Sequence, residues 1–349
     1  LQAGVEVVED ISVAEVLLGV KEVPISQLIP NKTYFFFSHT FKKQEYNRAL
    51  LRAVLDKHIR LIDYELLTLS SGRRIIGFGR YAGVVGAYNG LIGWGKITGD
   101  FRLKAAHNCF DRHEVNTELQ KVKLPNDFKL VMTGGGRVAA GISEILQSIG
   151  LHKVDPNDFL IESFDRPVYT ALTVQEYARR VDGRSFYNHE FYKSADGFES
   201  AFLPYAQEAD MFIAGHYWEE GSPFFFTRQD ARNERFNLRM IADISCDIDG
   251  PVASTIRPST ITNPFYGYDP QSESEVGLGE LGSIGVMAVD NLPGELPRDA
   301  SEDFGAELLN DVLPQLFNHD RDGILKRATE AENGHLTPHF SYLQDYVDA

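Results

Sequence analysis

Runs of apolar residues alternate with amphipathic segments along the first third of the chain. Three of these runs predict buried strands, at 14–20, 33–37 and 59–64, and the segment 44–58 predicts a helix between the last two. Near-continuous apolar strands that alternate with helices indicate a parallel sheet covered on both faces. The opening residues Val5-Glu6-Val7-Val8 predict a further strand, and since no initiator Met precedes them, we expect an N-terminal segment to be missing.

A second set of elements follows residues 76–93, which are rich in glycine, alanine and aromatic residues and predict a close-packed helix between two domains. After the polar segment 111–127, further strands are predicted at 128–132, 159–164, 209–215, 240–244 and 284–289. The final amphipathic stretch, 299–318, predicts a helix that returns to the first domain, with one apolar face made of Phe304, Leu308, Leu309, Val312, Leu313 and Leu316. The pattern therefore predicts an α/β fold with two domains, residues 1–115 with 300–349 and residues 116–299.

The most specific motif is a glycine-rich turn between the strand at 128–132 and an amphipathic helix. Gly134-x-Gly136-x-x-Ala139 fits the dinucleotide fingerprint GxGxxG/A in its required context of strand, turn and helix. Gly134 permits the tight turn, Gly136 lets the backbone approach a pyrophosphate, and Ala139 and Gly141 let the helix pack on the strand. The alternative is a tight turn without a ligand. The expected cofactor-binding residues at this helix N-terminus are Gly134, Gly136, Arg137 and Val138.

Composition narrows the classes of partner. The net charge of −16 argues against nucleic acid as a partner, because phosphate neutralisation needs a basic surface. The two cysteines, Cys109 and Cys246, are too few for a disulfide framework and suit a reducing cytoplasm. No apolar run is long enough to span a bilayer, and no signal peptide is present, so we expect a cytoplasmic protein that does not associate with membranes.

Polar side chains follow the predicted strands of the first domain. A lysine and a histidine at neighbouring strand ends can serve as an acid–base pair, because burial and nearby charges tune both toward neutral pH. Arginines beyond them can bind carboxylates bidentately. The alternatives are a structural histidine, a solvated Lys–Glu pair and a surface hairpin. The residues concerned are Lys21, Glu22, His39, Lys42, Asp63, Glu65, Arg73 and Arg74.

Several segments, in the right order, resemble one enzyme family over nearly the whole chain. They are Gly19–Pro24, Phe37–Lys42, Ile62–Glu65, Gly72–Arg74, Gly215–Glu219, Thr227–Asp230, Ala242–Asp247, Asn263–Phe265 and Val289–Pro293. These segments are similar to the saccharopine dehydrogenase (lysine-forming) and lysine–2-oxoglutarate reductase family, which is related to alanine dehydrogenase and the transhydrogenase nucleotide-binding subunit.

The resemblance implies two Rossmann-like domains with parallel sheets and an active site in the cleft between them. It also implies a nicotinamide cofactor, amino-acid and 2-oxo-acid substrates, and acid–base chemistry that needs no metal. Lys21 and His39 match the acid–base residues of the family. Positions matching its substrate site are Glu22, Lys42, Glu65 and Arg74, and Asp243 and Asp290 match residues near the nicotinamide.

The expected function is therefore oxidoreduction at the CH–NH bond of saccharopine, in either direction. An alanine dehydrogenase-like enzyme and a non-catalytic dinucleotide sensor are the alternatives, and the oligomeric state is left open. Of the two cofactors, NAD is favoured slightly over NADP, because Glu162 and Asp165 near a predicted strand end outnumber Arg166. The segment 173–176 is a second candidate for this cofactor-selecting loop.

Overall fold

The computed structural model describes residues 4–349 and divides the chain into two compact units. The first is Leu1–Gly77 with Glu302–Ala349, and the second is Phe78–Ser301. The chain therefore returns to the first unit after the second, as the amphipathic C-terminal pattern predicted. Residues 78–115, which we expected in the first domain, belong instead to the second unit, because the helix that they contain is buried there against the larger sheet.

The first unit is built on a five-stranded sheet in which β1, β2 and β3 run parallel and the last two strands are antiparallel. In spatial order its strands are β1 (Val16–Lys21), β2 (Thr33–Phe37), β3 (Arg60–Asp63), β14 (Thr329–Glu332) and β15 (His335–Leu336). The helices around it are η1 (Ile25–Gln27), η2 (Thr40–Lys42), η3 (Glu45–Asn47), α1 (Arg48–Asp56), η4 (Tyr64–Leu66), the π-helical η7 (Leu308–Val312), α11 (Leu313–Phe317), α12 (Ile324–Ala328), η8 (Pro338–Leu343) and α13 (Gln344–Asp348).

Two predictions for this unit need correction. Val5–Val8 forms no strand, because no other strand in residues 4–349 pairs with it, and Val5 and Val7 are exposed. The C-terminal amphipathic stretch is helical but begins as α10 (Pro297–Glu307) and passes through a π-helical turn. That turn shifts the helical register, so Leu308 and Val312 are buried while Leu309 is exposed.

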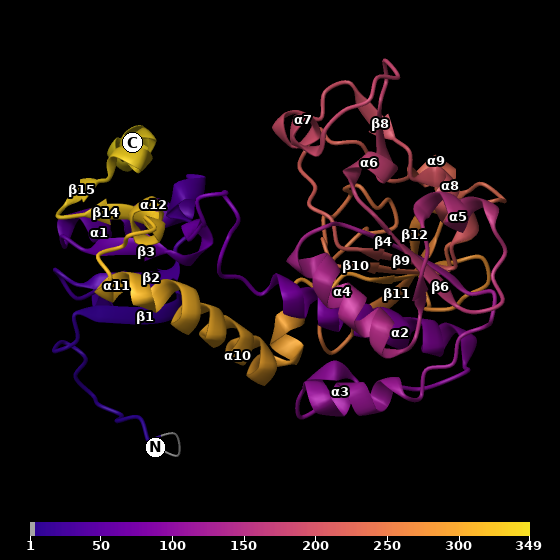
Figure 1. Cartoon of the computed structure of the whole chain (residues 1–349), viewed down its shortest axis with the longest axis horizontal. Helices are drawn as coiled ribbons and strands as arrows, with labels where there is room; N and C mark the ends of the chain where they lie inside the picture. The colour runs from indigo at the N-terminus through magenta and orange to yellow at the C-terminus, as the bar shows by residue number, and fades with distance from the viewer. Residues whose placement is uncertain (1–3) are drawn as a thin grey trace. The chain divides into compact units, whose positions relative to one another are not determined.

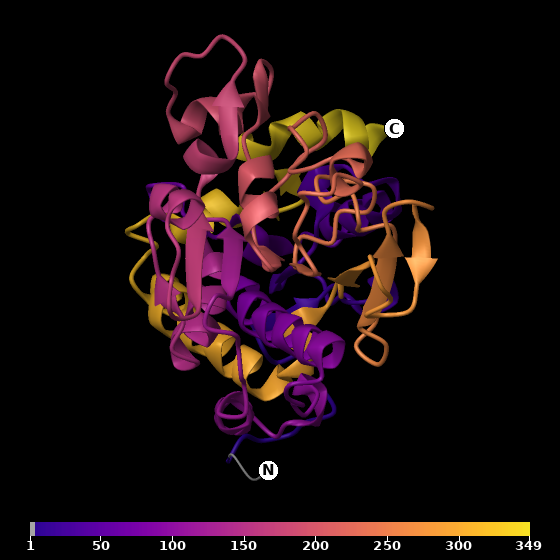
Figure 2. The same ribbon diagram turned by 90° about the vertical axis from the view of Figure 1, so that its right-hand side faces the viewer.

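The second unit contains an eight-stranded sheet whose central strands are parallel and whose one edge is antiparallel. Figure 2 shows that edge, β11 and β12, in orange. In spatial order the strands are β12 (Ser274–Val276), β11 (Phe265–Asp269), β13 (Ile284–Met287), β10 (Met240–Asp243), β9 (Met211–Ala214), β4 (Lys129–Thr133), β6 (Val168–Leu172) and β5 (His152–Lys153). Apolar cores lie on both faces of this sheet, with Leu130 and Met132 in one and Val131 in the other.

Two long helices, α2 (Gly79–Thr98) and α4 (Arg137–Ser148), pack against each other beside this sheet (Figure 1). A Cβ on Gly83 would lie 2.0 Å from the carbonyl oxygen of Val138, and one on Gly141 would lie 2.0 Å from that of Arg80. The helices therefore cross with backbone against backbone. Gly141 serves this helix–helix contact and not, as we expected, close packing of the helix on the strand.

The remaining elements of the second unit are short. They are η5 (Ala106–Asn108), α3 (Arg112–Leu119), α5 (Pro156–Ile161), α6 (Val174–Tyr177), β7 (Ala178–Arg180), α7 (Asn188–Lys193), β8 (Phe198–Ser200), α8 (Leu203–Glu208), α9 (Arg228–Ala231) and η6 (Leu292–Glu295). Across residues 4–349, no helix has both the length and the apolar character required to cross a membrane.

The strand predicted at 159–164 is wrong. Residues 156–161 form helix α5, which begins with the Asp155 carboxylate accepting a hydrogen bond from the Asn157 N–H (2.8 Å) and with Pro156 in its first turn. The second central strand is instead β6. An N-cap and an N-terminal proline were the overlooked helix signals, and they outweighed the apolar character of the segment.

Candidate active site

The carboxyl ends of the three parallel strands of the first unit carry most of the predicted catalytic residues. The strands β1 and β2 are paired with Lys21 opposite Phe37, so Lys21 and the segment that leads to His39 leave adjacent strand ends. The next strand, β3, ends at Asp63, two residues before Glu65. Lys21 and Glu22 are both exposed, and neither side chain has a hydrogen bond or ion pair within residues 4–349. The structure thus brings the strand ends together but leaves these two side chains in solvent.

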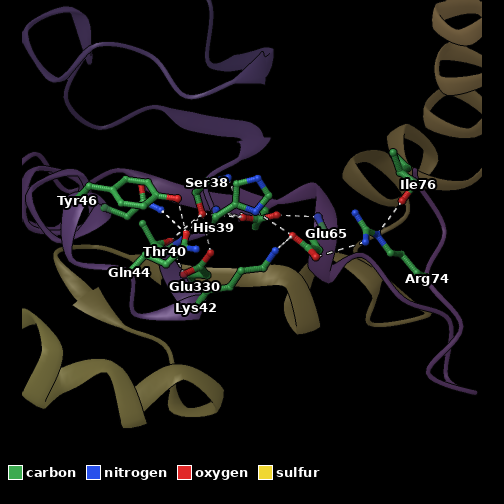
Figure 3. A network of polar contacts seen from close by, with 12 residues as sticks. Ser38, His39, Thr40, Lys42, Gln44, Tyr46, Glu65, Arg74, Ile76 and Glu330 are labelled. Carbon is green, nitrogen blue, oxygen red and sulfur yellow. Dashed lines mark hydrogen bonds and ion pairs between the residues drawn. The ribbon is translucent and has the colours of Figure 1, made fainter. Parts of the chain in front are cut away.

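His39 is held in a defined orientation. Its backbone is left-handed (φ 55°), and its imidazole lies beside the Phe37 ring with 6.2 Å between the ring centroids. Its Nδ1 lies 2.9 Å from Oε2 of Glu65 (Figure 3). An ionised carboxylate can only accept a hydrogen bond, so we assign the imidazole proton to Nδ1. This tautomer leaves the lone pair on Nε2, which has no protein partner among residues 4–349 and is available as a base.

Glu65 lies at the centre of three basic side chains. Besides His39, the Lys42 Nζ lies 2.9 Å from Oε2, and the Arg74 Nη1 donates to Oε1 at 3.4 Å (Figure 3). Burial by itself raises the pKa of Glu65, but the Lys42 hydrogen bond and the charges of Arg74, Lys42 and His39 outweigh it and lower the pKa. Glu65 is therefore a carboxylate at neutral pH.

The two arginines that follow Gly72 are placed differently. Arg73 is exposed in the turn, whereas Arg74 reaches Glu65, donates from Nε to the Ile76 carbonyl (3.0 Å) and lies over the Phe37 ring. These contacts fix the plane of the Arg74 guanidinium. A fixed, planar guanidinium suits the recognition of a substrate carboxylate.

The loop that carries His39 rests on two buried carboxylates. Asp63 Oδ2 accepts hydrogen bonds from the backbone N–H groups of Ser38 (2.8 Å) and His39 (3.0 Å), and its Oδ1 accepts one from the Glu65 N–H (2.6 Å). The Thr40 hydroxyl donates to Oε2 of Glu330 (2.7 Å), and the Ser38 Oγ lies 2.9 Å from Oε1 of Glu330. The sequence pattern did not identify Glu330, because it lies on β14, near the far end of the chain. Only the pairing of β14 with β3 brings it to this loop.

In the second unit, the glycine turn has the geometry of a nucleotide-binding loop. Gly134 has φ 107°, and a Cβ there would lie 2.4 Å from the carbonyl oxygen of Gly215, so only glycine fits. At Gly136, in contrast, a Cβ would meet nothing within 4 Å. Gly136 is the N-cap of α4, so the first N–H groups of that helix, beginning at Arg137 and Val138, face the same region. The turn therefore combines a tight backbone crossing with open space at a positive helix end.

A buried histidine also lies next to the turn and was not singled out from the sequence. His216 follows β9, and its Nδ1 lies 2.9 Å from the Thr133 hydroxyl. Burial lowers the pKa of His216 to about 3, so the ring is neutral. A neutral, buried ring that packs against the rings of Tyr177 and Phe225 indicates a structural role.

Two of the acidic residues expected at the cofactor, Asp243 and Asp290, lie at or just beyond the carboxyl ends of the neighbouring parallel strands β10 and β13. Both oxygens of the buried Asp243 are occupied, with Oδ1 accepting from Ser245 and Cys246 and Oδ2 accepting from Thr255. Burial raises the pKa of Asp243, and these hydrogen bonds lower it less than burial raises it. Asp243 therefore anchors its own loop. Asp290, in contrast, is exposed beyond the end of β13.

Glu162 does not lie where the cofactor argument required it. It follows α5, whose Phe159 carbonyl accepts a hydrogen bond from Lys129 Nζ (2.8 Å) at the amino end of β4. The glycine turn lies at the opposite, carboxyl end of β4. The interpretation of Glu162, Asp165 and Arg166 as cofactor-selecting residues is therefore wrong.

The second candidate loop, 173–176, is the one that follows the central strand β6. The Gly134 N–H donates to the Leu172 carbonyl (3.0 Å), so this strand end lies beside the glycine turn. The only acidic residue of the loop is Glu176, whose Oε2 accepts from both the N–H and the hydroxyl of Thr173 (each 2.6 Å). No group of three or more His, Cys, Asp or Glu side chains in residues 4–349 has the arrangement of a metal site.

Several known proteins are similar to this chain. Residues 1–85 match the family described as Alanine dehydrogenase/PNT, N-terminal domain. The chain is 31% identical over 392 residues to alpha-aminoadipic semialdehyde synthase, mitochondrial, of Bos taurus, an alignment that covers 99% of this chain and 42% of that protein. It is 24% identical over 347 residues to saccharopine dehydrogenase (NAD(+), L-lysine-forming) of Candida albicans, covering 92% of this chain and 79% of that protein.

Among solved structures, an L-alanine dehydrogenase matches with a TM-score of 0.60 at 16% identity, covering 99% of this chain and 85% of that chain. This match confirms the predicted fold class, mixed α/β with parallel sheets of the Rossmann kind. The relatives confirm the resemblance inferred from the sequence motifs. The chain spans 42% of the length of its Bos taurus relative.

Proposed function

The chain is a homologue of the saccharopine dehydrogenases and the alpha-aminoadipic semialdehyde synthases, and on this premise we propose that it is a nicotinamide-dependent oxidoreductase acting on the C–N bond of saccharopine. The observation that carries the proposal is His39, whose Nδ1 is bound to Glu65 and whose Nε2 is left available as a base. Lys42 and Arg74 converge on the same carboxylate and supply positive charge for an acidic substrate.

The reaction needs proton transfer at two substrate atoms. In the direction of saccharopine cleavage, loss of hydride converts the secondary amine to an imine, water adds to the imine carbon, and the carbinolamine collapses to lysine and 2-oxoglutarate. We assign to His39 the proton taken from the attacking water and returned during collapse. We assign to Lys21 the proton of the substrate nitrogen. General acid–base assistance of this kind contributes about 10²–10⁴-fold in rate.

Basic and acidic groups around His39 suit the charges of this substrate. Saccharopine carries several carboxylates, for which Lys42 and the fixed Arg74 guanidinium are the natural partners. Glu22, at the end of β1, suits an ammonium group of the same molecule. Glu65 balances the local positive charge, so the site attracts carboxylates without binding them irreversibly.

A bound nicotinamide dinucleotide would supply or accept the hydride. The glycine turn suits it because the space beside Gly136 is open and the positive N-terminal end of α4 begins there. For the choice of cofactor we propose NAD over NADP on the basis of Glu176, the only acidic residue in the loop after β6. A carboxylate in this loop accepts from ribose hydroxyls and repels a 2′-phosphate.

A single set of assays tests both parts of the proposal. NADH or NADPH oxidation is followed with 2-oxoglutarate plus lysine, with 2-oxoglutarate alone, and with pyruvate plus ammonia. We expect turnover only with lysine present, and a kcat/KM at least about tenfold higher with NADH, equivalent to about 1.4 kcal/mol. Turnover with pyruvate and ammonia supports an alanine dehydrogenase-like enzyme. Dinucleotide binding without turnover in any mixture supports a sensor, and a preference for NADPH removes the role given to Glu176.

A further inference from the structure

Beneath the His39 loop, the side chains of Asp63 and Glu330 are both fully buried and both lie within hydrogen-bond distance of one hydroxyl group. The Ser38 Oγ is 2.6 Å from Oδ2 of Asp63 and 2.9 Å from Oε1 of Glu330 (Figure 3). A serine hydroxyl carries a single hydrogen and can donate it to only one of these carboxyl groups. The second short contact needs a hydrogen of its own, because two facing lone pairs in a buried site repel each other.

We propose that Asp63 and Glu330 share one proton through the Ser38 hydroxyl, and that Glu330 thereby acts as a positioning residue for His39. The catalytic part of this inference rests on the proposed function. The shared proton itself does not, because it follows from the geometry of the buried network.

The hydrogen bonds indicate which carboxyl group holds the proton. Asp63 accepts three backbone N–H groups, and such bonds favour its ionised form. Within residues 4–349, the carboxyl group of Glu330 accepts no backbone N–H, and its hydrogen-bond partners are the hydroxyls of Ser38 and Thr40. With the proton on Oε1, Glu330 donates to Ser38, Ser38 donates to Asp63, and Thr40 donates to Oε2, so each of the three contacts between a hydroxyl and a carboxyl group has one hydrogen.

The groups that face Glu330 from the surrounding elements favour the same state. Burial and the nearby Asp63 charge raise the pKa of Glu330 to about 8. The phenols of Tyr342 and Tyr346, from η8 and α13, also lie near Glu330; burial raises the pKa of both, so they are neutral and supply no positive charge that would favour the ionised form. The Thr40 and Ser38 hydroxyls are the groups that favour the ionised form, and they do not overcome burial.

The chain of bonds leads from Glu330 to the imidazole of His39. Glu330 fixes the Ser38 hydroxyl, Ser38 contacts Asp63, and Asp63 holds the backbone N–H groups of both His39 and Glu65. These two residues are the ones that meet at 2.9 Å. Because His39 has a left-handed backbone, its conformation depends on such support. Loss of the proton on Glu330 would place two negative charges against Ser38 and loosen this support.

The decisive experiment compares Glu330→Gln with Glu330→Leu. The amide of Gln has a donor and an acceptor in the places of the protonated carboxyl group, so Glu330→Gln should rescue the geometry that Glu330→Leu removes. Difference infrared spectroscopy of the wild type against Glu330→Gln at pH 7 should show the carbonyl band of a protonated carboxyl group. Absence of this band, with only carboxylate bands lost, overturns the shared proton whatever the activity of the protein.

The ¹⁵N shifts of His39 report the positioning role without a substrate. We expect the Nδ1–H tautomer in the wild type and in Glu330→Gln at pH 7, and a mixture of tautomers in Glu330→Leu. As the pH rises through about 8, the wild type should lose this preference while Glu330→Gln keeps it. If the wild type and Glu330→Gln show the same Nδ1–H preference at all pH values, the positioning role is overturned. That comparison also stands if Glu330→Leu does not fold.

Glu295→Gln is the matched control, since Glu295 is a second buried glutamate, located in the other unit and bonded to Asn89. In Glu295→Gln, the tautomer of His39 should depend on pH as it does in the wild type. If Glu295→Gln also kept the Nδ1–H tautomer of His39 above pH 8, the effect would be a general one of replacing a buried glutamate, and the positioning role would be overturned.

Discussion

The two candidate sites of this chain are built in opposite ways. The glycine turn of the second unit comes from consecutive residues, and its chemistry belongs to the backbone: a φ of 107° at Gly134 and the N-terminal end of α4, whose N-cap is Gly136. The polar cluster of the first unit depends on side chains from η4, β3 and β14: Glu65 bonds the His39 ring, Asp63 accepts from the His39 N–H, and Glu330 bonds the neighbouring Ser38. A site made of backbone is specified by local sequence, whereas a site made of side chains is specified by strand pairing.

This difference decides how each site should respond to mutation. In the turn, a Cβ at Gly134 would collide with the Gly215 carbonyl, whereas a Cβ at Gly136 would meet nothing within 4 Å. In the cluster, each change spreads to several partners, because Glu65 bonds three basic side chains at once. Paired variants in the two sites therefore test the contrast.

The largest effects are expected in the glycine turn, where Gly136→Val should weaken dinucleotide binding and Gly134→Val should prevent folding. A Cβ at 136 would meet nothing within 4 Å, and the side chain of a valine there would extend into the open space at the helix N-terminus, so we expect a folded protein whose dinucleotide affinity falls at least about 100-fold. A valine at 134 collides with the Gly215 carbonyl and should prevent folding of the second unit. Circular dichroism and calorimetric titration with NADH provide the measurements. Unchanged affinity in Gly136→Val would mean that the turn is purely structural.

Next in size are Lys21→Met and His39→Gln in the cluster. Each should lower kcat by about 10²-fold or more, because each removes a proton-transfer group while leaving the turn intact. Steady-state kinetics with saturating substrate measure kcat, and calorimetric titration with the dinucleotide measures the affinity of the turn, which should stay unchanged. Arg73→Gln, a change at an exposed neighbour of Arg74, is the matched control. Near-normal kcat in either variant removes that residue from the acid–base pair.

The smallest effect is on stability. The pKa of Glu65 is lower in the folded protein than its ordinary value of 4.5, so its charge stabilises the fold above that pH. This contribution disappears as the pH falls through the lowered folded pKa. We expect Glu65→Gln to destabilise the first unit by about 1 kcal/mol at pH 7 and low salt, since the basic partners are partly exposed.

Thermal unfolding of the wild type and Glu65→Gln across the acid range, with and without salt, measures this effect. The gap in unfolding temperature should close at low pH and narrow with salt. A gap that stays constant with pH would show that Glu65 acts through packing and not through charge.

Several sequence predictions failed for one reason, which is that apolar or acidic character alone does not say where a segment lies. The apolar segment 159–164 contains part of a capped helix, and this moved Glu162 away from the cofactor end of the sheet. Residues 78–115 belong to the second unit because glycines let α2 approach α4 and the sheet.

By itself, the sequence determined the α/β class, most of the central strands and the glycine turn, because strand periodicity and glycine conformation act over a few residues. It also placed Lys21, His39 and Glu65 at strand ends. Only the tertiary structure decided that Glu65 binds His39 and that Glu330 lies beneath the loop between them. Those contacts depend on parallel pairing of β1–β3 and antiparallel pairing of β14 with β3, and pairing between distant strands leaves no local signal in the sequence.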